Sequence, residues 1–271
     1  MVRRTTHSVF RLLAIAAWVL LSAGCEQIGE GERLIAVSLP GDTTGRGHVL
    51  VEFTGFRCVN CPKASQEAET LRQTYGENLI VVAMHPASNP FTQGAAKYDY
   101  TCEEADVYYT YMGGLATTPF PIGNIDFRHD GHGYLNDYSD WATLAAEAMS
   151  EHEQASLNIK ATYEADKLTI RTSCRAKMEQ ECRLILWLVE DSVQGAQALP
   201  DGSVTTEYTH RHMLRRAIGD PWGETVTAST TPAEQTATAT LAIEDKRRYR
   251  IIAILMNADK QIINAKQTTI Q

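Results

Sequence analysis

The stretch FTGFRCVNCPKAS, residues 53–65, contains Cys58 and Cys61 in a CxxC arrangement. The apolar run before it, residues 48–53, predicts a buried strand, and apolar residues recur at the helical period after the cysteines. A second apolar run, residues 79–84, predicts another buried strand. Strand, helix and strand at this spacing form a βαβ unit, so the two strands should be parallel with a right-handed crossover.

A CxxC beside a βαβ pattern is typical of a thiol–disulfide redox site. Cys58 would lie near the helix start, where unpaired N–H groups and the helix dipole favour a thiolate. Arg57 adds positive charge, and Pro62 suits the first helical turn. A redox-active disulfide, a structural disulfide and half of a zinc site are the open interpretations. Zinc needs four ligands, and no second CxxC or HxxxH is present, so we predict no metal and no cofactor.

Glu52 stands inside the apolar run that precedes the cysteines. It is either an outward-facing residue of an edge strand or a buried acid beneath the CxxC. Burying a carboxylate is costly, and desolvation would raise its pKa. A buried Glu52 could then pass a proton to or from Cys61.

The first residues predict a bacterial lipoprotein signal peptide, residues 1–24. Arginines precede an apolar core at residues 12–21, which is too short to span a bilayer. The following LSAGC, residues 21–25, resembles a lipobox, which implies cleavage before Cys25 and lipid attachment to it. An ordinary signal peptide with an incidental cysteine is the alternative.

The rest of the chain divides into two styles of sequence. Residues 25–46 resemble an acidic tether and lead into a first strand, and residues 47–152 alternate strands with helices. Residues 153–271 contain about seven strand-like segments separated by turns, which predicts an immunoglobulin-like sandwich. The net charge of -8 argues against a nucleic-acid partner, because such binding depends on neutralising phosphates.

Three further cysteines, Cys102, Cys174 and Cys182, lie after the CxxC. Cys174 and Cys182 flank a loop between two strand-like segments, and an oxidising envelope favours a structural disulfide there. Cys102 has no obvious partner. It is either a small buried hydrophobic residue or a thiol that exchanges with the CxxC.

The residues around the CxxC resemble two families. VEF at 51–53 with CVNCP at 58–62 resembles the thioredoxin superfamily, and Pro121 resembles its cis-proline, although an ordinary trans proline is the alternative. The order of FTGFRCVNCP, YTCEEAD, FPIGNIDFR and YTHRHMLR resembles the twenty-eight-kilodalton outer-membrane lipoprotein family of Bacteroidetes. This resemblance implies a thioredoxin-like domain at 47–152, a small β domain at 153–271, and an outer-membrane location facing the periplasm or the cell surface.

Two functions are therefore expected, from different classes. The first is a lipid-anchored thiol–disulfide oxidoreductase acting on a protein thiol or disulfide. In it Cys58 exchanges, Cys61 resolves, Glu52 relays a proton and Pro121 shapes the substrate site. The second is a surface binding or adhesion lipoprotein that keeps a permanent disulfide and uses its tyrosines for contact. Arg57 and the dipeptide between the cysteines depart from standard oxidoreductases, so the direction of electron flow is not predicted.

Overall fold

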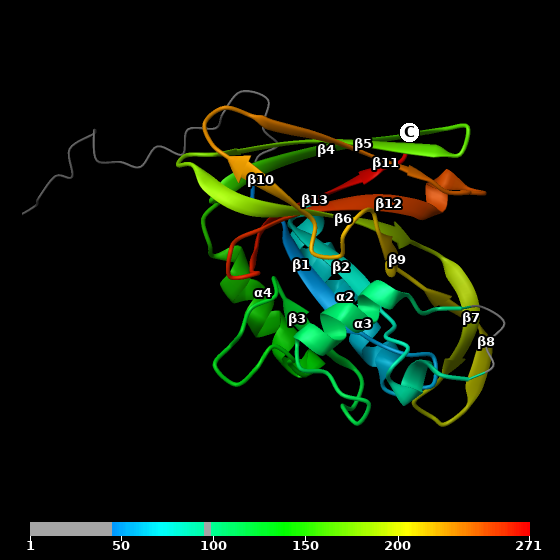
Figure 1. The fold of residues 1–271 in the computed structure, drawn as a ribbon. Coiled ribbons are helices and arrows are strands. Elements are labelled where there is room, and N and C mark those ends of the chain that lie inside the picture. Colours follow the sequence, from blue (N-terminus) through cyan, green and yellow to red (C-terminus); the bar gives the residue numbers. More distant parts are fainter. Residues whose placement is uncertain (1–44, 95–98) are drawn as a thin grey trace, which may run out of the picture. The chain divides into compact units, whose positions relative to one another are not determined.

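Strand β1 (His48–Phe53) leads into the CxxC turn, helix α2 (Cys61–Tyr75) follows, and strand β2 (Leu79–Met84) lies beside β1 (Figure 1). The structure, a computed structural model, describes residues 45–94 and 99–271. β1 and β2 pair in parallel along their whole length, and every residue of both strands is buried. The predicted strand–helix–strand unit is therefore confirmed.

The sheet that contains β1 and β2 continues into the second half of the chain. Its strand order is β13-β12-β6-β9-β2-β1-β3, with β10 paired to β6. The strands that join β1 and β2 in it are β3 (Ile122–Ile125), β6 (Gln180–Glu190), β9 (Met213–Ala217), β10 (Glu224–Ala228), β12 (Tyr249–Met256) and β13 (Ile262–Thr269). The junction is β9, which pairs in parallel with β2 at Ala83 and Met213, and antiparallel with β6. Strands from both halves thus form one mixed sheet.

Further elements cover this sheet. A three-stranded sheet of β4 (Ala155–Glu164), β5 (Lys167–Ala176) and β11 (Ala233–Thr240) packs over β6, β12 and β13 through a shared hydrophobic core (Figure 1). Helices α2 and α4 (Trp141–Met149) pack on one face of β1 and β2, and α3 (Glu103–Tyr111) packs on the other. A separate hairpin, β7 (Val193–Ala198) and β8 (Val204–His210), completes the strands.

The predicted fold class, a thioredoxin-like α/β domain followed by an immunoglobulin-like sandwich, is wrong. Strands predominate among the described residues, and the mixed sheet joins the two halves. The physical reason lies in β6 and β12, which are buried on both faces. Along β12, Ile251 faces the core under the three-stranded sheet, whereas Ile252 faces the core that contains α3. An apolar run without polar alternation is typical of a strand covered on both sides.

The start of β1 is held by the C-terminal strand. The Arg46 guanidinium donates to the Ile262 carbonyl (2.8 Å) and lies 3.3 Å from the Asp126 carboxylate. The Gly47 amide donates to the Asn264 side chain (2.9 Å), and a Cβ added to Gly47 would lie 1.9 Å from the Ala265 carbonyl oxygen. This close packing fixes β1, and therefore Glu52, against β13.

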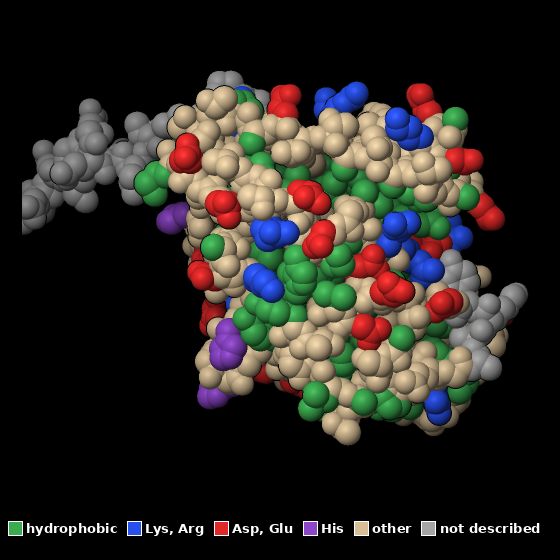
Figure 2. All heavy atoms as spheres, in the orientation of Figure 1, with side chains coloured by type: hydrophobic (Ala, Val, Ile, Leu, Met, Phe, Trp, Pro, Cys, Tyr) green, Lys and Arg blue, Asp and Glu red, His purple; other side chains and the backbone are tan. Residues whose placement is uncertain are grey.

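The surface of the described residues carries both signs of charge. On the face shown in Figure 2, Asp and Glu side chains are interspersed with Lys and Arg around a central group of hydrophobic side chains. No helix in residues 45–94 or 99–271 is long and apolar enough to cross a membrane.

Candidate functional site

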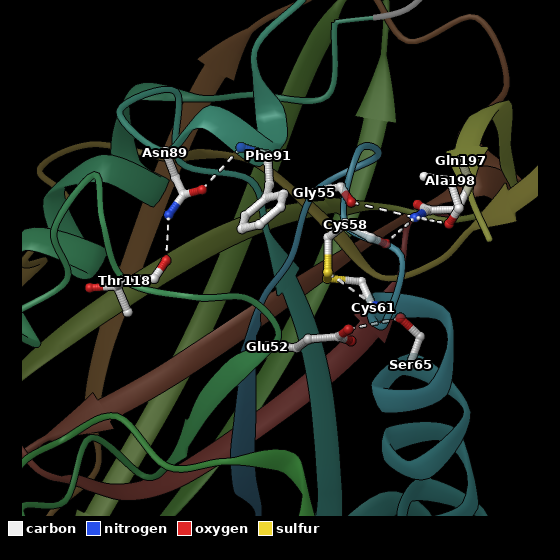
Figure 3. The surroundings of a disulfide bond; sticks show 10 residues. All are labelled: Glu52, Gly55, Cys58, Cys61, Ser65, Asn89, Phe91, Thr118, Gln197 and Ala198. Atoms are coloured by element: carbon white, nitrogen blue, oxygen red, sulfur yellow. Dashed lines mark hydrogen bonds between the residues drawn. A yellow bond between two sulfur atoms is a disulfide. The ribbon is translucent and has the colours of Figure 1, made fainter. Parts of the chain in front are cut away.

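Cys58 and Cys61 form a disulfide at the start of α2 (Figure 3). Cys61 is the first residue of the helix, and its backbone N–H donates to the Cys58 sulfur at 3.1 Å. The N-cap residue, Asn60, makes no side-chain capping bond, so α2 has no side-chain oxygen that competes at its N-terminus. A thiolate formed at Cys58 would therefore be stabilised by a backbone N–H group and by the helix dipole.

Both cysteines are buried. Cys58 is 2% exposed and Cys61 1%, whereas Val59 between them is 41% exposed. The pair belongs to the same hydrophobic core as Phe53, and the half-buried Phe91 packs against that core beside Cys58 (Figure 3). Attack on either sulfur by another protein therefore requires the turn or its neighbours to move.

Glu52 lies below the disulfide on the α2 side of β1 (Figure 3). β1 pairs with β2 on one side and β3 on the other, and Glu52 is 2% exposed, so the outward-facing interpretation is wrong. The Ser65 hydroxyl on α2 donates to the Glu52 carboxylate at 2.8 Å. Burial raises the pKa of Glu52 from 4.5 to about 7, although Ser65, His212 and Thr54 act in the opposite direction. The carboxyl group can therefore gain or lose a proton near neutral pH.

Pro121 lies at the same end of β1 as the cysteines. The Phe120–Pro121 peptide bond is cis. The next residue, Ile122, begins β3 and pairs with Phe53, the last residue of β1. Phe120 packs in the core that also contains Cys58.

Gln197 on β7 holds the CxxC turn from the second half of the chain (Figure 3). Its side-chain nitrogen donates to the carbonyl oxygens of Cys58 (2.9 Å), Ala198 (3.0 Å) and Gly55 (3.5 Å). The Ala198 amide donates to the Phe56 carbonyl at 2.7 Å. The sequence did not predict this contact, because VQGAQA in β7 has neither strand alternation nor a recognisable motif.

Replacing Gln197 tests how firmly the hairpin holds this turn. We expect Gln197→Leu to lower the free energy of unfolding by about 1–3 kcal/mol, because the buried carbonyl oxygens would lose their donor. Chemical denaturation followed by circular dichroism measures the change. Gln194→Leu, at an exposed position of the same strand, is the matched control and should leave stability within about 0.5 kcal/mol. Equal losses in the two variants would contradict the role of Gln197.

A cavity of about 330 Å³ lies beside Glu52. The residues that line it come from α2 and β7, and from β1, β2 and β8 with the residues that follow these strands: Glu52, Thr54, Pro62, Ser65, Gln66, Glu69, Val81, Ala83, His85, Gln197, Tyr208, Thr209, His210, Arg211 and His212. Arg211 and His212 separate β8 from β9 here, and His212 takes a positive φ of 54°. The break brings His212 to 3.6 Å from Glu69 and 3.4 Å from Asp191.

The other predicted cysteine sites have different outcomes. Cys25 and the signal peptide lie outside the described residues. Cys174 and Cys182 are free thiols and not the predicted disulfide, because β5 and β6 do not form a hairpin. Cys174 pairs with β4 and β11, whereas Cys182 pairs with β10. Cys102 is also free, and burial raises its pKa to about 12, so it is a poor exchanging thiol.

Within residues 45–94 and 99–271, no group of three or more His, Cys, Asp or Glu side chains could hold a metal ion.

Fold and site together define a largely β protein with a CxxC disulfide at the start of a helix. Residues 106–271 match the family described as outer membrane protein Omp28, and the chain belongs to that family. This confirms the resemblance to the twenty-eight-kilodalton outer-membrane family and the expected location in the outer membrane. The matched segment begins after the CxxC, so the match itself carries no information about Cys58 and Cys61.

Two solved structures resemble the chain. HBP35 of Porphyromonas gingivalis is 15% identical with a TM-score of 0.66, covering 84% of this chain and 76% of that one. Protein AGR_C_4864 from Agrobacterium tumefaciens is 12% identical with a TM-score of 0.53, covering 84% of this chain and 96% of that one. At these identities the similarity concerns the fold alone. No curated protein matches the chain.

Proposed function

We propose that this outer-membrane protein is a thiol–disulfide oxidoreductase whose redox couple is Cys58 and Cys61. The observation that carries the proposal is a disulfide at a helix start with a buried acid of raised pKa, Glu52, beneath it. Glu52 is the feature that a merely structural disulfide would not need, because burying a carboxyl group costs free energy. The partner would be a protein dithiol or disulfide in the cell envelope, and lipid on Cys25 would hold the enzyme at the membrane.

The exchange can be written with all atoms and electrons accounted for. A substrate thiolate attacks the Cys58 sulfur, the Cys58–Cys61 bond breaks, and Cys61 leaves as a thiolate that takes the proton held by Glu52. The second substrate thiol passes its proton to the ionised Glu52 and attacks the mixed disulfide. Cys58 then leaves as a thiolate, which the helix start stabilises and which takes up a proton. The substrate loses two electrons and two protons, and the reverse sequence reduces a substrate disulfide.

A redox titration of the purified full-length chain tests the proposal. In defined mixtures of reduced and oxidised dithiothreitol or glutathione, the fraction of disulfide-bonded Cys58 is read by alkylation and mass spectrometry. We expect a reversible two-electron equilibrium in the native protein and catalysis of insulin reduction. A native disulfide that resists reduction until the protein unfolds would contradict the proposal.

The second candidate function is a binding protein whose disulfide is permanent. The burial of both cysteines favours it, since a structural disulfide needs no access. The tyrosines of α3 do not favour it. Tyr108 and Tyr109 are fully buried, and the Tyr108 ring packs 5.2 Å from the Trp187 ring, so both attach the helix to the sheet. The titration separates the two functions.

A further inference from the structure

The cavity beside Glu52 is lined by side chains that take no part in the proposed redox reaction, apart from Glu52 itself. Neither Cys58 nor Cys61 lines it, although Glu52 and Ser65 do. Ligand pockets measure roughly 300–1,000 Å³, so about 330 Å³ is suited to a small molecule. We propose that this cavity binds a neutral, polyhydroxylated molecule of monosaccharide size.

Most charged groups around the cavity already have partners, and the remaining one, Arg211, is exposed, where an ion pair contributes little. The Arg72 guanidinium binds the Glu69 carboxylate with two hydrogen bonds of 2.7 and 2.8 Å and lowers the pKa of Glu69 to about 2. His212 lies between Glu69 and Asp191. Glu52 keeps its proton up to about neutral pH. A charged ligand that is buried away from Arg211 would have to break one of these pairs or stay unpaired after losing its water.

His85 is a buried side chain whose ring nitrogens need a hydrogen-bond partner, which a ligand or solvent molecule could supply. It is 1% exposed, and neither ring nitrogen has a hydrogen-bond partner in the described structure. Burial, with His210 and Arg215 nearby, lowers the pKa of His85 to about 3, so the ring is neutral and presents one donor and one acceptor. A hydroxyl group, which also donates and accepts, can satisfy either nitrogen, and an unsatisfied buried polar group is costly.

The other walls suit a sugar ring. Residues with neutral hydroxyl or amide side chains line the cavity from α2, from β8 and from the end of β1, namely Thr54, Ser65, Gln66, Tyr208 and Thr209. The Tyr208 and His210 rings lie 4.9 Å apart and offer flat surfaces for C–H groups, and Val81 and Ala83 supply an apolar wall. Burial keeps the His210 ring neutral as well, because it lowers its pKa. Hydrogen-bonding groups of both kinds beside rings match the alternating hydroxyl and C–H surfaces of a pyranose.

Saturation-transfer NMR and calorimetry on the full-length chain in detergent test this site. The probes are D-glucose, D-galactose and N-acetyl-D-glucosamine, with D-glucuronate and D-glucosamine as charged counterparts of similar size. We expect saturable binding of at least one neutral sugar, and binding of its charged counterpart that is weaker by roughly tenfold or more, since about 1.4 kcal/mol corresponds to tenfold. Equal binding of neutral and charged sugars, or no saturable binding, would overturn the proposal.

Variants tie the binding to the cavity. His85→Phe keeps a ring but removes both nitrogens, so we expect binding to fall about tenfold while thermal stability is kept, because an unsatisfied buried group is removed. Thr209→Trp, at a half-exposed wall position, should block the cavity and provides a second test if His85→Phe does not fold. His132→Phe, in an exposed turn, is the control and should bind as the wild type does. Unchanged binding in both cavity variants would contradict the site.

The sugar site and the redox site can fail separately. A chain with both Cys58→Ser and Cys61→Ser should still bind the neutral sugar, because neither cysteine lines the cavity. Loss of binding in this double variant, with its fold intact by circular dichroism, would count against an independent site.

Discussion

Cys58→Ser should reduce insulin-reduction activity to the uncatalysed background, and Cys61→Ser should trap substrates on Cys58 as mixed disulfides. The two outcomes differ because only Cys58 carries the hydrogen bond from the Cys61 N–H group that stabilises a thiolate. In Cys61→Ser the attacking sulfur remains, but no thiol is left to resolve the intermediate. Non-reducing electrophoresis of membranes, followed by mass spectrometry of the trapped species, measures the result.

The control for this trapping is Cys102→Ser. Cys102 is a free thiol packed against the same core as the disulfide, but burial keeps it protonated. This variant should keep full activity, and combined with Cys61→Ser it should leave trapping unchanged. If Cys61→Ser traps nothing, or if the trapped species depend on Cys102, then Cys58 is not the exchanging cysteine.

The local part of the fold could be predicted from sequence, and the reason is visible in β1 and β2. Both predicted ranges match the observed strands, because each is a short apolar run bounded by turn residues. Gly76, with a φ of 58°, follows the last residue of α2, which fits the preference for glycine at helix ends. Cys58, Cys61 and Glu52 could be placed together for the same reason, since one strand, one turn and one helix start position all three.

The long-range part could not be predicted. Within the mixed sheet, β2 meets β9 at the register pair of Ala83 with Met213, and no local pattern specifies such a pairing. The apolar runs of β6 and β12 were predicted only as strands of a sandwich, and nothing in them specified which strands or helices would cover each face. Gln197 reaches the site only because segments far apart in the sequence pack together. The predicted disulfide between Cys174 and Cys182 was wrong for the same reason, because the sequence does not show which strands pair with β5 and β6.

The titration of Glu52 should make the stability of the protein depend on pH. In the folded chain its pKa is about 7, against 4.5 for a solvated glutamate. Between these two values the folded state keeps a proton that the unfolded state has lost, so stability should fall as the pH rises from 4.5 to about 7 and level off above that. A shift of this size corresponds to about 3 kcal/mol. Glu52→Gln removes the titration, so the variant should be more stable than the wild type at pH 8 by about this amount.

Glu52→Gln should slow catalysis although it raises stability at high pH. This combination of effects would identify Glu52 as a proton relay. A positioned general acid or base contributes about 100-fold or more, so Glu52→Gln should slow thiol–disulfide exchange by about that factor and remove the break near pH 7 from the rate profile. Denaturation curves and stopped-flow exchange with dithiothreitol, from pH 4 to pH 9, measure both effects. Glu147→Gln, at an exposed position of α4, should change neither. A variant that is stabilised at high pH but exchanges as fast as the wild type would show that Glu52 is buried without relaying protons.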